Sequence, residues 1–398
     1  MKRITFLPVF AIVALILNAC GGGSSTNSSS SPQAFEQEEK SFLHDLFLTE
    51  YLWYDQVASN VDYALYNTPQ EMIDGLKLNP PDQWSFAMTS QEYEDFANQE
   101  TSGFGFGYTS DFTLYIVRIN APAYGNLQRG DRILEVNGEP VTQENLSAAS
   151  NNINVQTTFN VLRNSSQIAI NVTPKPYAFN VSLGKVIKQN GKNIAYLRYD
   201  SFTESSVAEF ETIFSTFKAA NISELIIDMR YNGGGSIGAA SALLDNISNA
   251  QPGERQVYLD WNANYQNRNS TYTFENADLS DGNELNMRRV IFLVTQNSAS
   301  ASELVISALK PYLGNTNVVT IGTATHGKPV GMSGRIHNSR YYFLVNFFVR
   351  NTAGHTTSYS GIPATCIAND DISHSLGDPN ETMFKTALHY IATNGSCL

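Results

Sequence analysis

The chain has 398 residues, of which 42% are apolar, so it is long enough to form two or three compact units. Its 25 basic and 37 acidic side chains give a formal net charge of −12, which argues against binding to nucleic acid and against electrostatic attachment to anionic lipid. The six histidines show neither H-E-x-x-H nor any other paired metal spacing, so we expect no metal site and no cofactor.

Residues 1–19 have the pattern of a secretion signal. A charged start (Lys2, Arg3) precedes an apolar run that is too short to span a bilayer, which favours a cleaved signal peptide. The signal ends in Leu-Asn-Ala-Cys, which resembles a bacterial lipobox and would make Cys20 the lipidated first residue; the alternative is an ordinary signal with a cysteine there by chance. We expect a lipoprotein of the bacterial envelope that faces the periplasm, and Gly21, in place of a retaining aspartate, points to the outer membrane.

The mature chain would begin with a tether and a helical segment. Residues 20–35 are rich in glycine and serine and cannot bury a core. Residues 36–100 carry an apolar and aromatic stripe near helical spacing, which is typical of a packing face, and the segment shows no readable chemistry. A break at residues 79–82 separates this stripe from a second short helix expected over residues 91–97.

Residues 101–178 are predicted to form a β-rich unit. Residues 130–140 alternate apolar and polar side chains up to a turn, as a half-buried strand does, and resemble the corresponding stretch of PDZ domains. That resemblance implies that the loop Gly103-Phe104-Gly105-Phe106 offers backbone N–H groups to the C-terminal carboxylate of a peptide, which would add a strand to the sheet. An ordinary glycine-rich strand is the alternative.

Residues 179–398 alternate predicted strands and helices, which indicates an α/β core with a largely parallel sheet. We expect the polar, Asn- and Tyr-rich stretch over residues 251–284 to be an irregular excursion from this core. The strands and helices are expected, in order, over residues 193–199, 206–218, 225–229, 239–247, 290–295, 301–309 and 318–321.

Three stretches of the core carry chemistry. A buried strand runs into the glycine-rich residues 231–236, whose N–H groups can face an anion. Residues 297–303 (NSASASE) lead into an apolar helix and place hydroxyls at its N-terminus, where developing negative charge is favoured. Lys328 follows in residues 325–328 (THGK), and a desolvated lysine can serve as the base for a serine. A serine cap beside a surface lysine would fit the last two patterns equally well.

The order of these segments resembles the C-terminal processing (tail-specific) serine peptidases. The resemblance implies a ClpP/crotonase-like core, a Ser-Lys dyad of Ser300 and Lys328, and an oxyanion hole made by the N–H groups of Gly234 and Ala301. Ser298 and Ser302 would then be hydrogen-bonding or capping residues. The chain departs from the family at Met332, where relatives commonly carry a glutamine that orients the lysine amine.

The resemblance implies a protein or peptide as the substrate, cut by an endopeptidase, and the family's name points to cleavage near the substrate's C-terminus. A catalytically weak or inactive peptide-binding scaffold remains an alternative, as do a different hydrolase using Ser300 and His326 as the base in place of Lys328. With Cys20 assigned to lipid, the remaining cysteines, Cys366 and Cys397, are expected to pair as a disulfide in an oxidising compartment.

Overall fold

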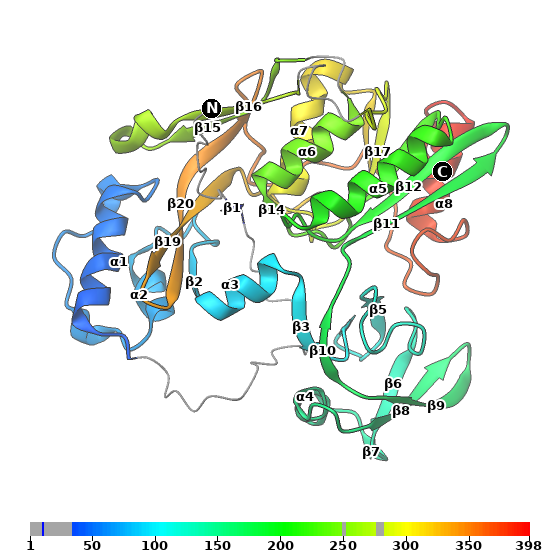
Figure 1. Cartoon of the computed structure of the whole chain (residues 1–398), viewed down its shortest axis with the longest axis horizontal. Helices are drawn as coiled ribbons and strands as arrows, with labels where there is room; N and C mark the ends of the chain where they lie inside the picture. Colours follow the sequence, from blue (N-terminus) through cyan, green and yellow to red (C-terminus); the bar gives the residue numbers. More distant parts are fainter. Residues whose placement is uncertain (1–9, 12–33, 249–251, 276–281) are drawn as a thin grey trace.

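The computed structural model describes residues 10–11, 34–248, 252–275 and 282–398 (Figure 1). The expected lipid attachment site, Cys20, and most of the expected signal and tether lie outside these residues. Among the residues described, no helix is both long and apolar enough to cross a membrane.

A six-stranded sheet forms the centre of the C-terminal part, in the order β11-β12-β13-β17-β18-β21. All neighbours pair in parallel except the antiparallel pair β11 and β12. The expected α/β core is therefore present. The strands are β11 (Ser182–Gln189), β12 (Lys192–Tyr199), β13 (Glu224–Asp228), β17 (Val290–Val294), β18 (Val318–Gly322) and β21 (Cys366–Ile367).

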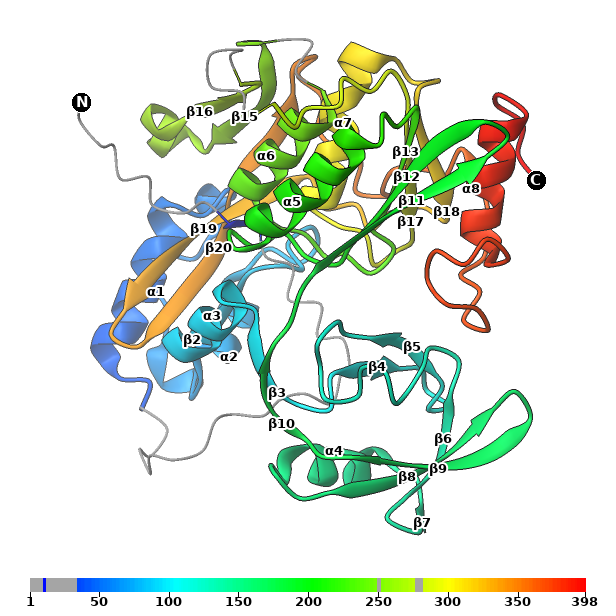
Figure 2. The same cartoon turned by 45° about the vertical axis from the view of Figure 1, so that its right-hand side comes forward.

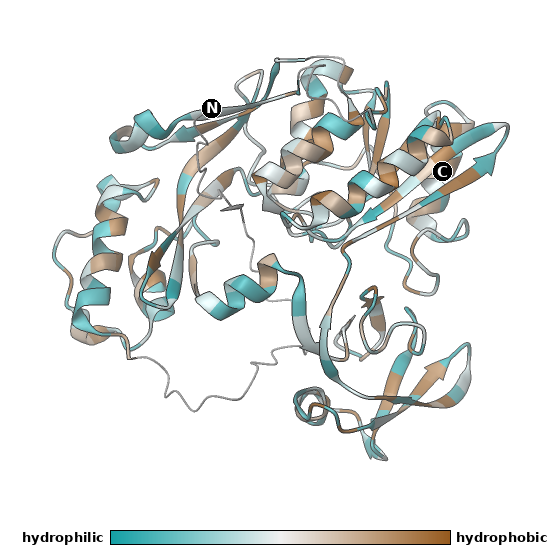
Figure 3. Ribbon diagram, viewed as in Figure 1, coloured by the Kyte–Doolittle hydropathy of each residue, from teal (hydrophilic) through white to brown (hydrophobic). Residues whose placement is uncertain are grey.

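Helices cover both faces of this sheet, which explains why its strands are nearly continuous apolar runs. Along β13, Leu225 and Ile227 face one apolar cluster, together with helices α5 (Ser206–Ala219), α6 (Ile237–Ile247) and α7 (Ala301–Leu313). The intervening Ile226 faces a second cluster, built with helix α8 (Thr382–Ala392). In Figure 3, α6 and α7 are mostly white to brown, as expected for helices buried on several sides.

A second sheet lies beside the first and contradicts one prediction. Residues 251–284 are not simply irregular, because they contain strands β15 and β16, and β15 pairs with β20. From Val257 onward, every second residue of β15 is a buried apolar one (Val257, Leu259, Trp261), and its partner β20 lies about ninety residues later, where local sequence cannot show it. The strands are β1 (Phe10–Ala11), β2 (Phe86–Thr89), β14 (Gly235–Ser236), β15 (Arg255–Trp261), β16 (Ser270–Thr273), β19 (Val330–His337) and β20 (Arg340–Asn351), and the short helix η3 (Ala263–Arg268) joins β15 to β16.

The N-terminal segment packs on this second sheet, next to β19 and β20 in Figure 1. Its aromatic stripe forms the contact: Phe47 and Tyr51 are fully buried in one cluster with Tyr342 and Phe343 of β20. The segment is helical as expected, except that β2 adds a strand to the edge of β20. Its helices are α1 (Gln37–Thr49), η1 (Tyr54–Gln56), η2 (Tyr63–Leu65), α2 (Pro69–Leu76) and α3 (Ser90–Ala97).

The β-rich unit has an apolar cluster of its own and is joined to the rest by the paired strands β3 and β10 (Figure 2). It touches the core through Arg129, whose guanidinium donates to the hydroxyl of Tyr231 and to the carbonyl of His374. Its elements are β3 (Glu100–Gly103), β4 (Phe106–Tyr108), β5 (Leu114–Val117), β6 (Arg132–Val136), β7 (Glu139–Pro140), α4 (Gln143–Asn151), β8 (Thr157–Arg163), β9 (Ser166–Val172) and β10 (Lys175–Ala178).

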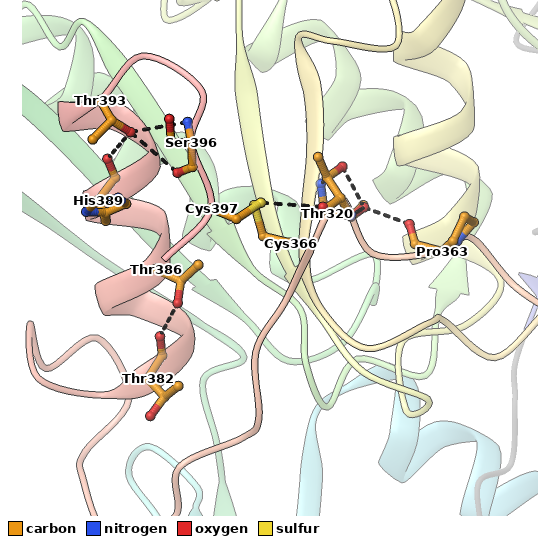
Figure 4. The surroundings of a disulfide bond; sticks show 10 residues. Thr320, Pro363, Cys366, Thr382, Thr386, His389, Thr393, Ser396 and Cys397 are labelled. Carbon is orange, nitrogen blue, oxygen red and sulfur yellow. Dashed lines mark hydrogen bonds between the residues drawn. A yellow bond between two sulfur atoms is a disulfide. The ribbon is translucent and has the colours of Figure 1, made fainter.

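Cys366 and Cys397, the pair expected from the sequence, form a disulfide (Figure 4). Cys366 lies in β21, the edge strand of the six-stranded sheet, and Cys397 follows α8 near the end of the chain. The bond therefore ties the C-terminal helix to the sheet that it covers.

Candidate active site

Ser300 lies on a tight turn between β17 and the first residue of α7. Its backbone has a φ of 58° and a ψ of −112°, a conformation that residues other than glycine rarely adopt. Such conformations cluster at functional sites because the surrounding structure must hold them in place. The residue is 5% exposed, and its neighbour Ala301 begins the helix, so the N–H of Ala301 belongs to the first turn, which has no acceptor within the helix.

One buried carboxylate, that of Glu303, fixes both the serine turn and the lysine loop. Its Oε2 accepts from the backbone N–H of Ser300 and from that of Lys328, both at 2.9 Å. Its Oε1 accepts from the N–H of Gly327 at 2.7 Å and from the hydroxyl of Thr325 at 2.5 Å. A single side chain therefore ties the backbone of Ser300 to that of Lys328.

Lys328 is buried, with 3% of its surface exposed. Burial lowers the pKa of its amine from 10.5 to about 7, against the carboxylates of Asp82 and Glu303, which raise it. A large fraction of the amine is therefore neutral near pH 7, as a base must be. Ser300 and Lys328 line the same pocket. Its other lining residues are Val257, Ala301, Leu304, Ser307, Pro329, Val330, Val349, Asn351 and Thr357.

His326 is poorly placed to be the base in place of Lys328. Its Nε2 accepts a hydrogen bond at 3.2 Å from the indole Nε1–H of Trp84, so the lone pair of that nitrogen is engaged. Its backbone N–H donates to the carbonyl of Ser298, which anchors the lysine loop to the serine turn. This geometry gives His326 a structural position.

The glycine loop lies against Ser300. Gly234 has a φ of 107°, and a Cβ added to it would come within 2.8 Å of the Cβ of Ser300, so only glycine fits. Its N–H donates to the side-chain oxygen of Asn232 at 2.9 Å. The N–H of Gly234 would have to leave this acceptor, or share it, to hold an oxyanion. The oxyanion role of Gly234 and Ala301 therefore stays a prediction.

Ser298 and Ser302, on either side of Ser300, tie its turn to this loop. Ser298 donates to the carbonyl of Met229 at 2.8 Å, and Ser302 donates to the carbonyl of Asn232 at 2.9 Å. Both therefore serve as hydrogen-bonding residues. Within the part of the chain that the structure describes, no three His, Cys, Asp or Glu side chains gather as a metal site would require.

The glycine loop of the β-rich unit lies far along the chain from this pocket. Phe104 and Phe106 are buried in the core of that unit, with their rings stacked at 5.7 Å, so only their backbone could meet a ligand. Gly105 has a φ of 82°, and its added Cβ would lie 2.2 Å from that of Ala121, so any side chain there would disturb the unit itself.

Two residues near the dyad were missed from the sequence as members of the site. Glu303 had a signal, since it ends the NSASASE run, but the run alone indicates a helix cap. Asp82 had none, because its approach to Lys328 depends on the packing of the N-terminal segment against β19 and β20.

Two family models match the N-terminal segment and the α/β core. Residues 193–362 match peptidase family S41, and residues 38–86 match the peptidase S41 N-terminal domain, so the two matches together cover more than half of the chain. The two matches include Ser300, Lys328, Gly234 and Asp82.

Individual proteins agree with these matches. A carboxy-terminal-processing protease of Bartonella bacilliformis is 24% identical over 297 residues, covering 67% of this chain and 63% of its own length. One from Bacillus subtilis is 24% identical over 293 residues, covering 68% of this chain and 58% of its own length. The chain thus spans about three fifths of the curated relatives that it matches.

A solved structure shows the same fold. The crystal structure of a putative S41 protease from Bacteroides fragilis superposes with a TM-score of 0.78 at 22% identity, covering 93% of this chain and 100% of the other. The family matches to both the N-terminal segment and the core, together with this shared fold, show that the chain is a member of peptidase family S41.

Proposed function

We propose that this protein is a serine endopeptidase that cuts protein or peptide substrates with a Ser300–Lys328 dyad. The observation that carries the proposal is the shared pocket, in which a strained serine and a lysine with a pKa of about 7 are both buried. A lysine with an ordinary pKa would be protonated at neutral pH and could take no proton from the serine.

The reaction follows from this geometry. The neutral amine of Lys328 takes the hydroxyl proton of Ser300, and the oxygen attacks the scissile carbonyl carbon, whose π electrons move onto its oxygen. The N–H groups of Ala301 and Gly234 would stabilise this oxyanion. The ammonium of Lys328 then protonates the leaving amine, and water, deprotonated by the same lysine, hydrolyses the acyl-serine.

The pocket favours an apolar substrate side chain next to the scissile bond. Its walls are formed by Val257, Leu304, Val330 and Val349, whereas Ser307 and Asn351 contribute polar atoms. Apolar walls lose affinity for charged side chains, which would be desolvated there without a partner.

Incubation of the full chain in mild detergent with an unfolded protein tests the activity. We expect fragments to appear with the wild-type chain and none with Ser300→Ala. Equal cleavage by both chains would indicate a contaminating protease, and no cleavage by either would favour the peptide-binding scaffold.

We further propose that the β-rich unit, through its PDZ-like glycine loop at residues 103–106, captures a free C-terminal carboxylate. A peptide with a free, apolar C-terminus should then be cut about tenfold faster at low concentration than its amidated form, because amidation removes a charge-assisted contact. Equal rates would make the unit structural. Gly105→Val is unsuited as a test, because Gly105 has a left-handed φ and no room for a Cβ.

We also propose that the protein is anchored by a lipid on Cys20 in the bacterial envelope, facing the periplasm. The lipobox-like residues before Cys20 support this, and so does the disulfide, because disulfides persist in oxidising compartments. Cys20→Ala should move the protein from the membrane fraction to the soluble fraction; an unchanged membrane fraction would refute the anchor.

A further inference from the structure

Lys328 is enclosed on one side by a segment that lies more than 240 residues earlier in the chain. This segment, residues 82–85, follows α2 and leads into β2. The indole ring of Trp84 has its centroid 6.0 Å from the Nζ of Lys328, and its N–H donates to His326, two residues away. Tyr359 stacks on the indole at 6.2 Å.

Asp82 is a fixed charge within this enclosure. It is fully buried, and its Oδ1 accepts from the backbone N–H groups of Trp84 and Ser85, both at 2.9 Å. Its Oδ2 accepts from the hydroxyl of Ser85 at 2.5 Å, and that hydroxyl oxygen accepts in turn from the N–H of Val345 in β20. Trp84 and Ser85 thus hold the carboxylate in one orientation, and the low dielectric of a buried site strengthens its interaction with a nearby charge.

In β19, the strand that follows the lysine, an apolar residue holds the position four residues after Lys328. Met332, four residues after Lys328, is fully buried in the apolar cluster that contains Tyr51 and Trp84. The β19 strand thus packs against the N-terminal segment, and the N-terminal segment places the carboxylate of Asp82 near Lys328.

We propose that Asp82 is a positioning residue for Lys328, and that it stabilises the ammonium formed when the lysine takes the proton of Ser300. The N-terminal segment is then part of the catalytic machinery. This proposal rests on the dyad mechanism proposed above.

Asp82 and Glu303 both raise the pKa of Lys328, and Asp82 is the one whose charge can be removed without loosening the serine turn. The two oxygens of Glu303 accept from four donors, three of them backbone N–H groups of that turn and of the lysine loop. The Nε2 of His326 accepts a hydrogen bond from the indole N–H of Trp84. Tyr359 and Tyr51 are phenols whose pKa is raised by burial, so they remain neutral at working pH.

Removal of the charge gives a signature that a purely structural role would not give. In Asp82→Asn, the amide oxygen still accepts from the backbone of residues 84 and 85, but the pKa of Lys328 falls because an attractive charge is lost. The acid limb of the kcat–pH profile should move down by about one unit, while kcat at pH 9 falls about three- to tenfold because the lysine is a weaker base. KM should equal that of the wild type, because Asp82 does not line the pocket.

A matched control comes from the same segment. Asp74→Asn removes an equal charge from an exposed carboxylate, which pairs with Lys77 at 2.6 Å. Its profile should superimpose on that of the wild type. A profile of Asp82→Asn that also superimposes on the wild type would overturn the proposal.

A second measurement needs neither peptidase activity nor a folded Asp82 variant. In the full chain carrying Ser300→Ala and ¹³C-labelled aspartate carboxyls, the Asp82 signal should show an inflection at the pH where Lys328 titrates. That inflection should vanish when Lys328→Met is added. If the Ser300→Ala chain shows no such inflection, the role of Asp82 is refuted. If only the dyad mechanism is wrong, the inflection remains and the wild-type chain shows no proteolysis.

Discussion

At the scale of single residues, burial determines what Lys328 can do. The amine is neutral above a pKa of about 7, so the peptidase rate should rise with pH through that value and level off above it. Lys328→Arg should abolish the activity with the fold retained, because a guanidinium stays protonated and cannot act as a base. The measurement is kcat/KM between pH 5 and 9, with circular dichroism as the check on folding. An active arginine variant would contradict the dyad and return His326 as the candidate base.

Glu303 is the second residue whose position matters for the site, because its two carboxylate oxygens accept hydrogen bonds from both the serine turn and the lysine loop. Glu303→Gln turns one oxygen into an NH2 group that must face N–H or O–H donors, so at least one buried donor loses its partner. We expect a loss of about 1–3 kcal/mol in the free energy of unfolding, measured in urea, and a fall in kcat of about tenfold or more.

The control for Glu303 is Glu92, which has the same place in the capping box of α3 but lies on the surface. Glu92→Gln should change the unfolding free energy by less than about 1 kcal/mol and leave kcat unchanged. Equal effects of the two substitutions would reduce Glu303 to an ordinary cap.

At the scale of elements, Asp245 near the end of α6 lies where burial and nearby carboxylates disfavour its charged form. Burial, reinforced by Glu275, Glu284 and Glu211, raises the pKa of Asp245 to about 7, although its Oδ1 accepts from Gln256 and from the backbone N–H of Glu275. The folded state therefore holds a proton that the unfolded state releases near pH 4, so this group's contribution to stability is lost as pH rises from about 4 to about 7.

Asp245→Asn should remove that loss, because the amide oxygen keeps both hydrogen bonds and carries no charge. We expect the melting temperature of the variant to exceed that of the wild type by a few degrees at pH 8 and to match it near pH 4. A difference that is constant across this range would show that the acid is not protonated in the fold.

Element by element, local pattern predicted the four inner strands of the six-stranded sheet (β12, β13, β17 and β18) but not its edge strands β11 and β21, and it predicted the second sheet poorly. The apolar runs of β13 and β17 are buried on both faces, so each run reads as a strand without knowledge of its partners. The strands β15 and β16 form a local hairpin within a polar, Asn- and Tyr-rich stretch, and β15 joins the second sheet by pairing with β20, a distant partner that local pattern does not reveal. The same contrast applies to the site: motifs marked Ser300, Lys328 and Gly234, whereas tertiary packing alone brings Asp82 to them.

At the scale of the whole molecule, three distant parts of the chain meet at one amine. The N-terminal segment encloses Lys328 with Trp84, the core supplies Ser300 and Glu303, and the second sheet provides the apolar wall at Val330. The family matches cover residues 38–86, which include Trp84, as well as the core. A chain that lost the packing between α1 and β20 would lose the enclosure that keeps the lysine amine neutral.

The disulfide acts on the molecule as a whole, since it closes a loop with a sequence separation of 31 residues around α8. Cross-linking such a loop restricts the unfolded chain, and loop-entropy models assign it about 3–4 kcal/mol. Reduction should therefore lower the melting temperature by roughly ten degrees. The catalytic pocket contains no residue of this loop, so peptidase activity at 25 °C should persist.

The matched control is a chain with Cys366→Ala and Cys397→Ala, which should melt at the lower temperature with or without reductant. Thiol titration of the unfolded protein provides the count: neither Cys366 nor Cys397 should react before reduction, and both should react after it. Two reactive thiols in protein recovered from an oxidising compartment would refute the disulfide. An unchanged melting temperature after full reduction would instead show that packing of α8 on the sheet, through Phe384 and Leu388, suffices to hold the end of the chain.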